Sequence, residues 1–401
     1  MMRFCVVNLG CKVNRVESDA IAAALLAAGY SEAEPAEADL IVVNTCTVTG
    51  EAEKKTRKAV HRALRANEHA RVVVTGCAVS LDAAGFKAMD ARVETATKGA
   101  LLESLAARVG DDQRVLRIGG AFPTRVGIKV QDGCNNACTY CIVHVARGRA
   151  WSRTASEVVE EAVTYARAGV GEIVLSGINL GSYRSEGLTL AGLLERLLAA
   201  TVDQTLPNTA CVRFRISSIE PMDVDDELIA LLAHSGGRVC RHLHLPLQSG
   251  SSRVLYDMAR PYDAREYRVL VDRLRTAVPE LSLSTDIIVG FPGESEEDFA
   301  STLEMAEYCS FSKIHVFPYS QREGTPAADR VDQVSSDIKA NRARCLRNLS
   351  SRLRSKERNR RRGTSELVLV ETAGKATTES YFEVEAPANS TPGTLVPLIL
   401  P

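Results

Sequence analysis

Three cysteines stand close together in the middle of the chain, at Cys134, Cys138 and Cys141. Their C-x3-C-x2-C spacing puts three thiolates on one loop, enough to hold three corners of a [4Fe-4S] cube. No fourth cysteine follows in this stretch of sequence, so one iron would stay open to a small molecule. A zinc site completed by His144 is the first alternative, and buried thiols without a metal are the second.

A second set of three cysteines is scattered through the first hundred residues. Cys11, Cys46 and Cys77 each follow a segment with the pattern of a buried strand. In a parallel sheet, the carboxyl ends of the strands share one edge, and open α/β sheets bind ligands there. The sequence therefore predicts a second three-thiolate site with an open iron. Small buried residues that merely end strands are the alternative interpretation.

The other cysteines fit no ligand pattern and are assigned to packing: Cys5, Cys211, Cys240, Cys309 and Cys345. Eleven cysteines in 401 residues are far too few for a disulfide scaffold, and their number is odd. Metal or redox chemistry is therefore the first function to test.

The elements that must position the scattered cysteines alternate between strands and helices. Strands are predicted at 3–8, 39–44 and 71–75, and helices at 17–28, 54–65 and 101–107. This alternation predicts a Rossmann-like α/β domain with a parallel sheet and crossover helices. We place this N-terminal domain, with the second cysteine set, at residues 1–115.

A longer alternation begins at residue 126. Strands are predicted at 126–131, 172–175, 212–216, 242–245, 282–289 and 313–317, and helices at 155–168, 190–200, 225–233, 264–277 and 296–308. Six strand–helix units in about 200 residues favour a partial (β/α)6 barrel over the eight-fold one, which needs about 250. A doubly wound open sheet is the competing architecture. We place this domain at residues 122–335.

A basic segment follows the predicted barrel. Residues 338–363 contain eleven Lys or Arg and one Glu, a charge of +10 that is hidden in the overall net charge of −1. We expect a basic linker helix at 336–363 and a short β domain at 364–401, with strands at 366–370, 381–385 and 395–400. Such a small β module cannot hold a core by itself, so we expect it to dock on the rest.

Composition narrows the class of protein. Hydrophobic residues make up 45% and charged residues 25%, which describes a globular chain of two or three domains. The sequence has no apolar run of the 18 to 20 residues that a membrane span needs, and its start does not look like a signal peptide. These features predict a cytoplasmic protein without a membrane partner.

Eight sequence blocks agree, in order, with one enzyme family. They are Asn8–Asn14 (NLGCKVN), Asn44–Val48 (NTCTV), Val74–Cys77 (VTGC), Gln131–Ile142 (QDGCNNACTYCI), Val174–Gly181 (VLSGINLG), Arg215–Pro221 (RISSIEP), His244–Gly250 (HLPLQSG) and Asp286–Glu294 (DIIVGFPGE). On these residues the chain closely resembles the methylthiotransferase family of radical S-adenosylmethionine (SAM) enzymes. The resemblance covers nearly the whole length, and the tail from residue 364 resembles a shortened TRAM domain.

The resemblance implies two [4Fe-4S] clusters with different tasks. On the cluster of Cys134, Cys138 and Cys141, SAM would chelate the open iron and be cleaved to a 5'-deoxyadenosyl radical. On the auxiliary cluster, of Cys11, Cys46 and Cys77, the open iron would carry the sulfur that is methylated by a first SAM. A reductant such as flavodoxin or ferredoxin and a sulfur donor are implied as partners. The SAM contacts that the resemblance implies are Gly177, Asn179, Ser217, Gln248, Gly290, Phe291 and Glu294.

Members of the family modify either an adenosine beside the tRNA anticodon or one aspartate of a ribosomal protein. Lys12 and Val13 after Cys11 resemble the branch that methylthiolates C2 of N6-threonylcarbamoyladenosine at position 37 of ANN-decoding tRNAs. The isopentenyladenosine branch and the ribosomal-protein branch are alternatives. An RNA-binding iron–sulfur protein without catalysis is a further one.

Clustered cations support an RNA partner, because Lys and Arg neutralise phosphates. The residues predicted to contact tRNA are Lys54, Lys55, Lys58, Arg147, Arg342, Arg354 and Arg361. A solvated face of an exposed helix is the alternative explanation of the basic segment.

Overall fold

The structure is a computed structural model that describes residues 2–47, 49–107, 124–202 and 212–401. The chain divides into two compact units, each described by itself below. The first unit is Met1–Pro123 with Gly133–Asn135 and Cys141–Arg149, and the second is Thr124–Asp132, Asn136–Tyr140 and Ala150–Pro401. No helix in the described part of the chain is long and apolar enough to cross a membrane.

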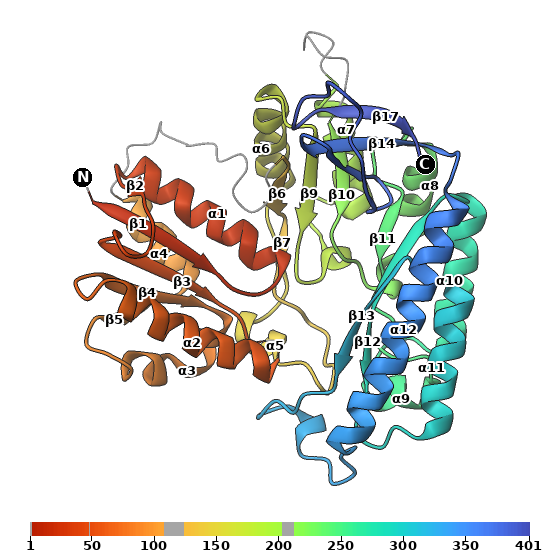
Figure 1. Cartoon of the computed structure of the whole chain (residues 1–401), viewed down its shortest axis with the longest axis horizontal. Helices are drawn as coiled ribbons and strands as arrows, with labels where there is room; N and C mark the ends of the chain where they lie inside the picture. The colour runs from red at the N-terminus through yellow and green to blue at the C-terminus, as the bar shows by residue number, and fades with distance from the viewer. Residues whose placement is uncertain (1, 48, 108–123, 203–211) are drawn as a thin grey trace. The chain divides into compact units, whose positions relative to one another are not determined.

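The first unit is built on a parallel sheet with the strand order β2-β1-β3-β4-β5 (Figure 1). Its strands are β1 (Arg3–Asn8), β2 (Ser31–Glu32), β3 (Leu40–Thr45), β4 (Arg71–Gly76) and β5 (Val93–Thr95). Its helices are α1 (Lys12–Ala27), α2 (Gly50–Ala66), α3 (Cys77–Lys87), α4 (Lys98–Ala106) and α5 (Val143–Arg147). The predicted Rossmann-like parallel sheet is confirmed.

Alternating residues of the buried strand β3 supply two cores on opposite faces of this sheet. Ile41 and Val43 pack with α2 and α3, whereas Leu40 and Val42 pack with α1 and α4. Helix α1 begins at Lys12, five residues before the predicted start at Glu17. Its first turn was missed because its buried side chains include Asn14, Glu17 and Ser18, which are polar and serve the site described below.

The second unit contains six parallel strands in two runs, β6-β9-β10 and β11-β12-β13. The strands are β6 (Val126–Lys129), β9 (Glu172–Ser176), β10 (Arg213–Ile216), β11 (His242–His244), β12 (Ser282–Val289) and β13 (Lys313–Pro318). A parallel bridge between Phe214 and Val239 continues the order from one run toward the other. The strand number and order agree with the predicted partial (β/α)6 barrel. A small antiparallel pair, β7 (Gln131–Asp132) and β8 (Trp151–Ser152), adjoins it.

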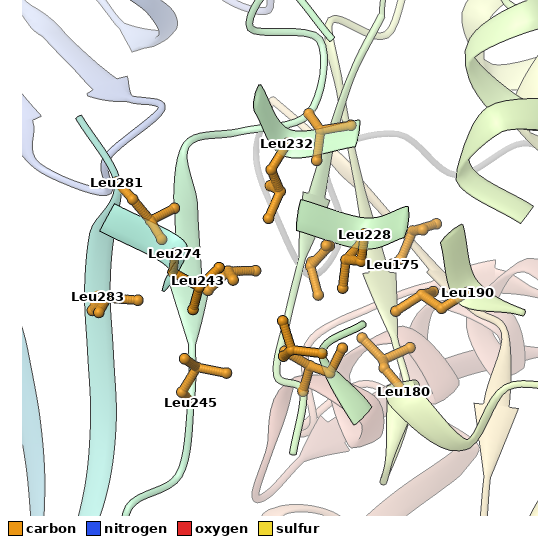
Figure 2. Packing of buried hydrophobic residues seen from close by; sticks show 14 of the residues in the cluster. Leu175, Leu180, Leu190, Leu228, Leu232, Leu243, Leu245, Leu274, Leu281 and Leu283 are labelled. Atoms are coloured by element: carbon orange, nitrogen blue, oxygen red, sulfur yellow. The ribbon is translucent and has the colours of Figure 1, made fainter. Parts of the chain in front are cut away.

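The helices of the barrel alternate with its strands. They are α6 (Ala155–Arg167), α7 (Leu190–Ala200), α8 (Asp226–His234), α9 (Ser252–Asp257), α10 (Ala264–Ala277) and α11 (Glu296–Cys309), with 3₁₀ turns η1 (Leu180–Ser182), η2 (Pro221–Asp223) and η3 (Pro326–Ala328). Leucines of strands and helices meet in the largest core, for example Leu243 and Leu283 with Leu274 (Figure 2). Because Leu243 and Leu245 face this core, His242 and His244 face the opposite side of β11.

The predicted linker helix is α12 (Ser336–Arg360), which packs on β13 through Leu346, Leu349 and Leu353. The C-terminal sheet follows it, with antiparallel order β16-β15-β14-β17. Its strands are β14 (Ser365–Thr372), β15 (Lys375–Thr378), β16 (Glu383–Val384) and β17 (Leu395–Ile399). Strand β15 was not predicted from the sequence. Both α12 and this sheet belong to the second compact unit.

Buried arginines attach the C-terminal sheet to the barrel. Arg213 donates to the Leu367 carbonyl at 2.6 Å, and Arg215 donates to the Glu379 carbonyl at 2.8 Å. The carboxylate of Glu172 pairs with both guanidiniums. Burial by itself raises the pKa of Glu172, but the charges of Arg215, Arg213 and Arg125 outweigh it and hold the pKa well below its usual range. The carboxylate therefore stays charged and keeps the arginines paired.

Candidate functional site

The three scattered cysteines of the first unit meet at one edge of its sheet. Cys46 directly follows β3, Cys77 directly follows β4 as the first residue of α3, and Cys11 precedes α1. The strand register places Asn8, Asn44 and Thr75 side by side, so the three cysteine-bearing loops leave the sheet at the same level. The sequence-based grouping of these cysteines therefore agrees with the fold.

Two glycines let the loops approach closely. Gly10 has φ +103°, and a Cβ there would lie 2.6 Å from Cys46 Cβ and 2.8 Å from Cys46 Sγ. Gly76 has φ +101°, and a Cβ there would lie 2.6 Å from the Thr45 carbonyl oxygen. Only glycine adopts these backbone conformations without strain, and only glycine fits the space. Glycine is thus required at the positions before Cys11 and Cys77 for the three loops to pack this closely.

The side chain of Asn14 ties two of the cysteine loops together. Its fully buried amide nitrogen donates to the Leu9 carbonyl at 2.8 Å and to the Thr45 carbonyl at 2.7 Å. Leu9 precedes Gly10 and Cys11, and Thr45 precedes Cys46. Removal of this amide would leave two carbonyl groups without a donor near the cysteines.

The hydroxyl of Thr45 ties in the third loop. Thr45 Oγ1 donates to the Thr75 carbonyl at 2.6 Å and accepts from the backbone N–H of Ala78 at 3.2 Å. Thr75 and Ala78 flank Gly76 and Cys77. Asn14 and Thr45 together therefore fix all three cysteine-bearing loops with side-chain hydrogen bonds, and the donor set and its glycine cradle fit an iron–sulfur cluster.

Arg147 was predicted to contact tRNA, and the structure contradicts that prediction. Its side chain is 5% exposed and pairs with Glu17, with Nη1 2.9 Å from Oε1. Its Nη2 donates to Asn14 Oδ1 at 2.6 Å, and its Nε donates to Cys77 Sγ at 3.2 Å. The guanidinium is therefore a buried part of the cysteine site and cannot reach a phosphate.

The loop of Cys134, Cys138 and Cys141 contributes residues to both compact units. In the first unit, the Cys134 N–H donates to the Gly148 carbonyl at 3.1 Å, and the Val143 N–H points to Cys141 Sγ at 3.4 Å. A Cβ on Gly133, which has φ +71°, would lie 2.1 Å from the Arg149 carbonyl oxygen. The start of this loop, at Gly133 and Cys134, is thus packed against Gly148 and Arg149.

In the second unit, Cys138 accepts a hydrogen bond from a buried arginine. Arg260 Nη1 donates to Cys138 Sγ at 3.1 Å, and the same guanidinium pairs with Glu220 and contacts the Tyr262 hydroxyl. Sequence reasoning missed Arg260, because it lies 122 positions from Cys138 and belongs to none of the recognised blocks. The aromatic before the last cysteine, Tyr140, packs against the small core of Met258, Phe291 and Tyr319.

The predicted SAM contacts Gly177, Asn179, Ser217 and Gln248 follow the ends of strands β9, β10 and β11. Gly177 lies against Gln131: a Cβ added at position 177 would lie 2.9 Å from Gln131 Oε1. The same oxygen accepts a hydrogen bond from the Asn179 N–H at 2.8 Å. Gln248 has φ +66°, and both of its backbone groups bond to β12, which leaves the side-chain amide for a ligand. The buried Ser176 Oγ has no partner within the described chain, which fits a polar ligand at this edge.

Phe291 and Glu294 were also predicted as SAM contacts, but their side chains make contacts that stabilise the loop after β12. Phe291 is fully buried, with its ring 5.5 Å from that of Tyr319. The Glu294 carboxylate accepts from the Gly290 and Phe291 N–H groups at 2.8 and 3.2 Å and pairs with Arg342. Burial raises the pKa of Glu294, although Arg342 opposes the shift. These two side chains hold the loop of Gly290 in shape.

Three more arginines that were predicted to contact tRNA are buried or half-buried. Arg342 is 5% exposed and pairs with Glu294 and Glu296, and Arg361 is 1% exposed and pairs with Glu357 and Glu366. Arg354 is half-buried, lies over the Phe382 ring and donates to the Ser312 carbonyl. The guanidinium groups of these three arginines therefore bind groups of the protein itself. The exposed cations of the basic helix are instead Arg344, Arg347, Arg352, Lys356 and Arg358, together with Arg360, which pairs with Glu357.

The predicted contacts on α2 lie at the surface. Lys54, Lys55 and Lys58 are exposed, and Lys55 pairs with Glu51 at 2.8 Å. Since an exposed pair one helical turn apart is weak, Lys55 is still able to reach an anion.

A polar group on the strands of the second unit was not predicted. His244, Asp286 and His315 come from β11, β12 and β13, with ligand-type atoms within 4.8 Å of one another. His244 Nε2 lies 3.3 Å from Asp286 Oδ1, and His244 Nδ1 lies 3.0 Å from Ser284 Oγ. The available signal was the polar residues alternating with core leucines along these strands. The face opposite the leucine core thus presents imidazole and carboxylate groups.

Two of the remaining cysteines are unsuited to bind metal. Burial raises the pKa of Cys240 to about 11 and that of Cys309 to about 12. Both thiols therefore stay protonated, which agrees with their assignment to packing. Cys5 is half-buried, Cys345 is exposed, and Cys211 lies outside the described residues.

Two family models match the chain. The model of the radical SAM superfamily matches residues 128–306, and that of the uncharacterized protein family UPF0004 matches residues 3–96. The first range contains the C-x3-C-x2-C loop and the barrel, and the second contains the three scattered cysteines. Each match thus falls on one of the two cysteine sets.

Curated relatives are similar over most of the chain. Threonylcarbamoyladenosine tRNA methylthiotransferase MtaB of Bacillus subtilis is 38% identical, over 86% of this chain and 80% of its own. The protein of the same name from Chlamydia pneumoniae is also 38% identical, over 95% and 90%. A tRNA-2-methylthio-N(6)-dimethylallyladenosine synthase of Dictyoglomus thermophilum is 34% identical, over 92% and 88%.

A solved structure shares the fold. The radical SAM methyltransferase TsrM of Kitasatospora setae, solved with cobalamin and a [4Fe-4S] cluster, superposes with a TM-score of 0.60 at 16% identity, covering 82% of this chain and 77% of that one. At this identity the likeness concerns the fold alone.

We expect Asn14→Ala to loosen the cysteine site of the first unit. The variant leaves the carbonyls of Leu9 and Thr45 without their donor, which should lower the free energy of unfolding by about 3 kcal/mol. Hydrogen–deuterium exchange of the full chain should then show faster exchange in peptides of β1 and β3. The matched control is Arg15→Ala, at the exposed next position of α1. Unchanged exchange in the Asn14 variant would contradict the role given to this amide.

Proposed function

Because the chain belongs to the radical SAM tRNA methylthiotransferases, we propose that its substrate is N6-threonylcarbamoyladenosine at position 37, beside the anticodon of ANN-decoding tRNAs. The enzyme inserts a methylthio group at C2 and gives 2-methylthio-N6-threonylcarbamoyladenosine. The names of the relatives at 38% identity support this substrate, as does the Lys12-Val13 pair after Cys11. The runner-up is dimethylallyladenosine, which relatives at 33 to 34% identity carry in their names.

Two cysteine sets, each without a fourth cysteine, carry the proposal of a two-cluster enzyme. Cys134, Cys138 and Cys141 hold one [4Fe-4S] cluster, and the set of Cys11, Cys46 and Cys77 holds the auxiliary one. When bound, such clusters supply an open iron and an electron for the cleavage of SAM. Membership of an enzyme family sets aside the alternative of an RNA-binding protein without catalysis, and the tRNA in the relatives' names disfavours a ribosomal-protein substrate.

The residues of the chain orient and shield the reacting groups. Arg260 holds Cys138 by a hydrogen bond, and Tyr140 packs into an apolar core beside it. Burial raises the pKa of the Tyr140 phenol, so that it stays neutral. Ser176, Gln248 and the loop of Gly290 offer polar and backbone groups at the strand ends, where we place SAM.

Exposed cations of two helices, one helix in each compact unit, are proposed to bind tRNA phosphates separately, and they replace the buried arginines of the sequence-based prediction. They are Lys54, Lys55 and Lys58 of α2, and Arg344, Arg347, Arg352, Lys356 and Arg358 of α12. Such residues bind phosphates without reading sequence, so they provide affinity while the strand ends provide selectivity. A reductant such as flavodoxin or ferredoxin, a sulfur donor and a cytoplasmic location complete the proposal.

Iron analysis tests the two-cluster proposal. Anaerobically reconstituted protein should contain about eight irons per chain, which is two cubes. Cys46→Ala should lower this to about four, because the auxiliary cluster loses one of its three ligands. Cys345→Ala, at an exposed position outside both sets, is the control and should leave the iron content unchanged.

A content near four irons after full reconstitution of the unaltered chain would refute the proposal. Zinc near one equivalent would favour the alternative with His144, whose buried Nδ1 has no partner within the described residues.

Mass spectrometry of tRNA nucleosides tests the substrate. In a strain that lacks the gene, the methylthio form of threonylcarbamoyladenosine should disappear, and the unmethylthiolated form should accumulate. A plasmid copy should restore it, and a copy with Cys138→Ala should not. Loss of the methylthio form of dimethylallyladenosine instead would establish the runner-up, and unchanged nucleosides would refute both.

The proposed phosphate contacts predict how tRNA affinity depends on salt. We expect the double variant Arg347→Ala and Arg358→Ala to weaken tRNA binding and to reduce the slope of log K against log salt by about two. Arg265→Ala, an exposed arginine on α10, is the control. A slope equal to that of the unaltered chain would show that α12 does not bind phosphates.

A further inference from the structure

Arg147 is fixed in a single orientation beside Cys77. Its Nε donates to Cys77 Sγ at 3.2 Å, its Nη1 donates to Glu17 Oε1 at 2.9 Å, and its Nη2 donates to Asn14 Oδ1 at 2.6 Å. Nη2 also donates to Glu17 Oε2 at 3.1 Å, and the side chain is 5% exposed. A lysine could not reproduce these contacts, because its ammonium is a single point of charge without a planar fork.

Charged side chains surround Arg147 beside Cys77. Glu17, 6% exposed, is the carboxylate partner of Arg147, and it also pairs with Lys98. Glu17 thus pairs with two cations. Three thiolates that hold a cluster are anionic, and buried anionic groups require compensation by hydrogen bonds or positive charge.

We propose that Arg147 is a positioning residue of the auxiliary cluster and that its hydrogen bond to Cys77 raises the reduction potential of that cluster. The inference rests on the proposed function, in which Cys11, Cys46 and Cys77 bind a [4Fe-4S] cluster. Hydrogen bonds to cluster sulfurs are among the factors that set such potentials. A donor to a ligand sulfur stabilises the reduced, more negative state most, and therefore raises the potential.

The hydrogen bond to Cys77 comes from the segment that carries the other set of cysteines. Arg147 ends helix α5, six residues after Cys141, so the segment of the radical SAM motif supplies a hydrogen bond to the other cysteine set. The corresponding donor to Cys138, Arg260, comes from the barrel. Each cysteine set thus has one sulfur that accepts from an arginine, and the two arginines serve as each other's controls.

The test isolates the auxiliary cluster in the full-length chain. Replacement of Cys134, Cys138 and Cys141 by alanine removes the other cluster, and a redox titration followed by electron paramagnetic resonance then reports one potential. We expect Arg147→Met to lower the reduction equilibrium constant about tenfold, a fall of about 59 mV for one electron. Arg260→Met and the exposed Arg149→Met are controls and should cause no shift.

A second variant covers the case in which Arg147→Met fails to assemble the cluster. Glu17→Gln removes the carboxylate that offsets the arginine, so it should shift the potential in the opposite direction. If the cluster assembles and neither variant changes the potential, the proposal for Arg147 is overturned and the proposed function stands. If the parent with three alanines binds no cluster at all, the two-cluster function fails first, and the role of Arg147 fails with it.

Discussion

The amide of Asn14 is the contact on which the first cysteine site depends. Its nitrogen holds the loops that precede Cys11 and Cys46, and its oxygen accepts from Arg147 and Lys98. Aspartate lacks the two donors, and leucine lacks both donors and acceptor. Since the group is fully buried, each lost bond would leave a polar atom without water. One asparagine thereby joins a sheet edge to an arginine far along the chain.

The basic segment shows how packing divides a run of like charges. Positions 342, 346, 349, 353 and 357 of α12 are buried at helical spacing, so the arginine in that stripe, Arg342, is buried against Glu294 and the Phe299 ring. Arg342 and Arg361 tolerate burial because Glu294, Glu357 and Glu366 accompany them. Between these positions, Arg344, Arg347 and Arg352 are exposed, and Arg354 is half-buried. The +10 charge of the segment is therefore partly structural and partly free for an anionic partner.

The two cysteine sets illustrate two ways to gather thiols. The C-x3-C-x2-C loop needs only local chain geometry, whereas Cys11, Cys46 and Cys77 depend on the register of three parallel strands. In both sets one sulfur accepts from an arginine more than 60 positions away. The environment of the sulfurs is thus set by the tertiary fold, even where their spacing is local.

The sequence by itself determined the parallel sheet, the barrel strands and the grouping of the cysteines, because hydrophobic period and strand ends are local patterns that parallel topology converts into one edge. It also gave the family through its cysteine blocks. It did not determine that α1 starts at Lys12, that Arg147 faces Cys77, or that Arg342 and Arg361 are buried. Those outcomes depend on partners up to 133 positions away. The residue type alone does not show whether an arginine is exposed to water or paired with a buried carboxylate. Only the tertiary structure supplies the partner.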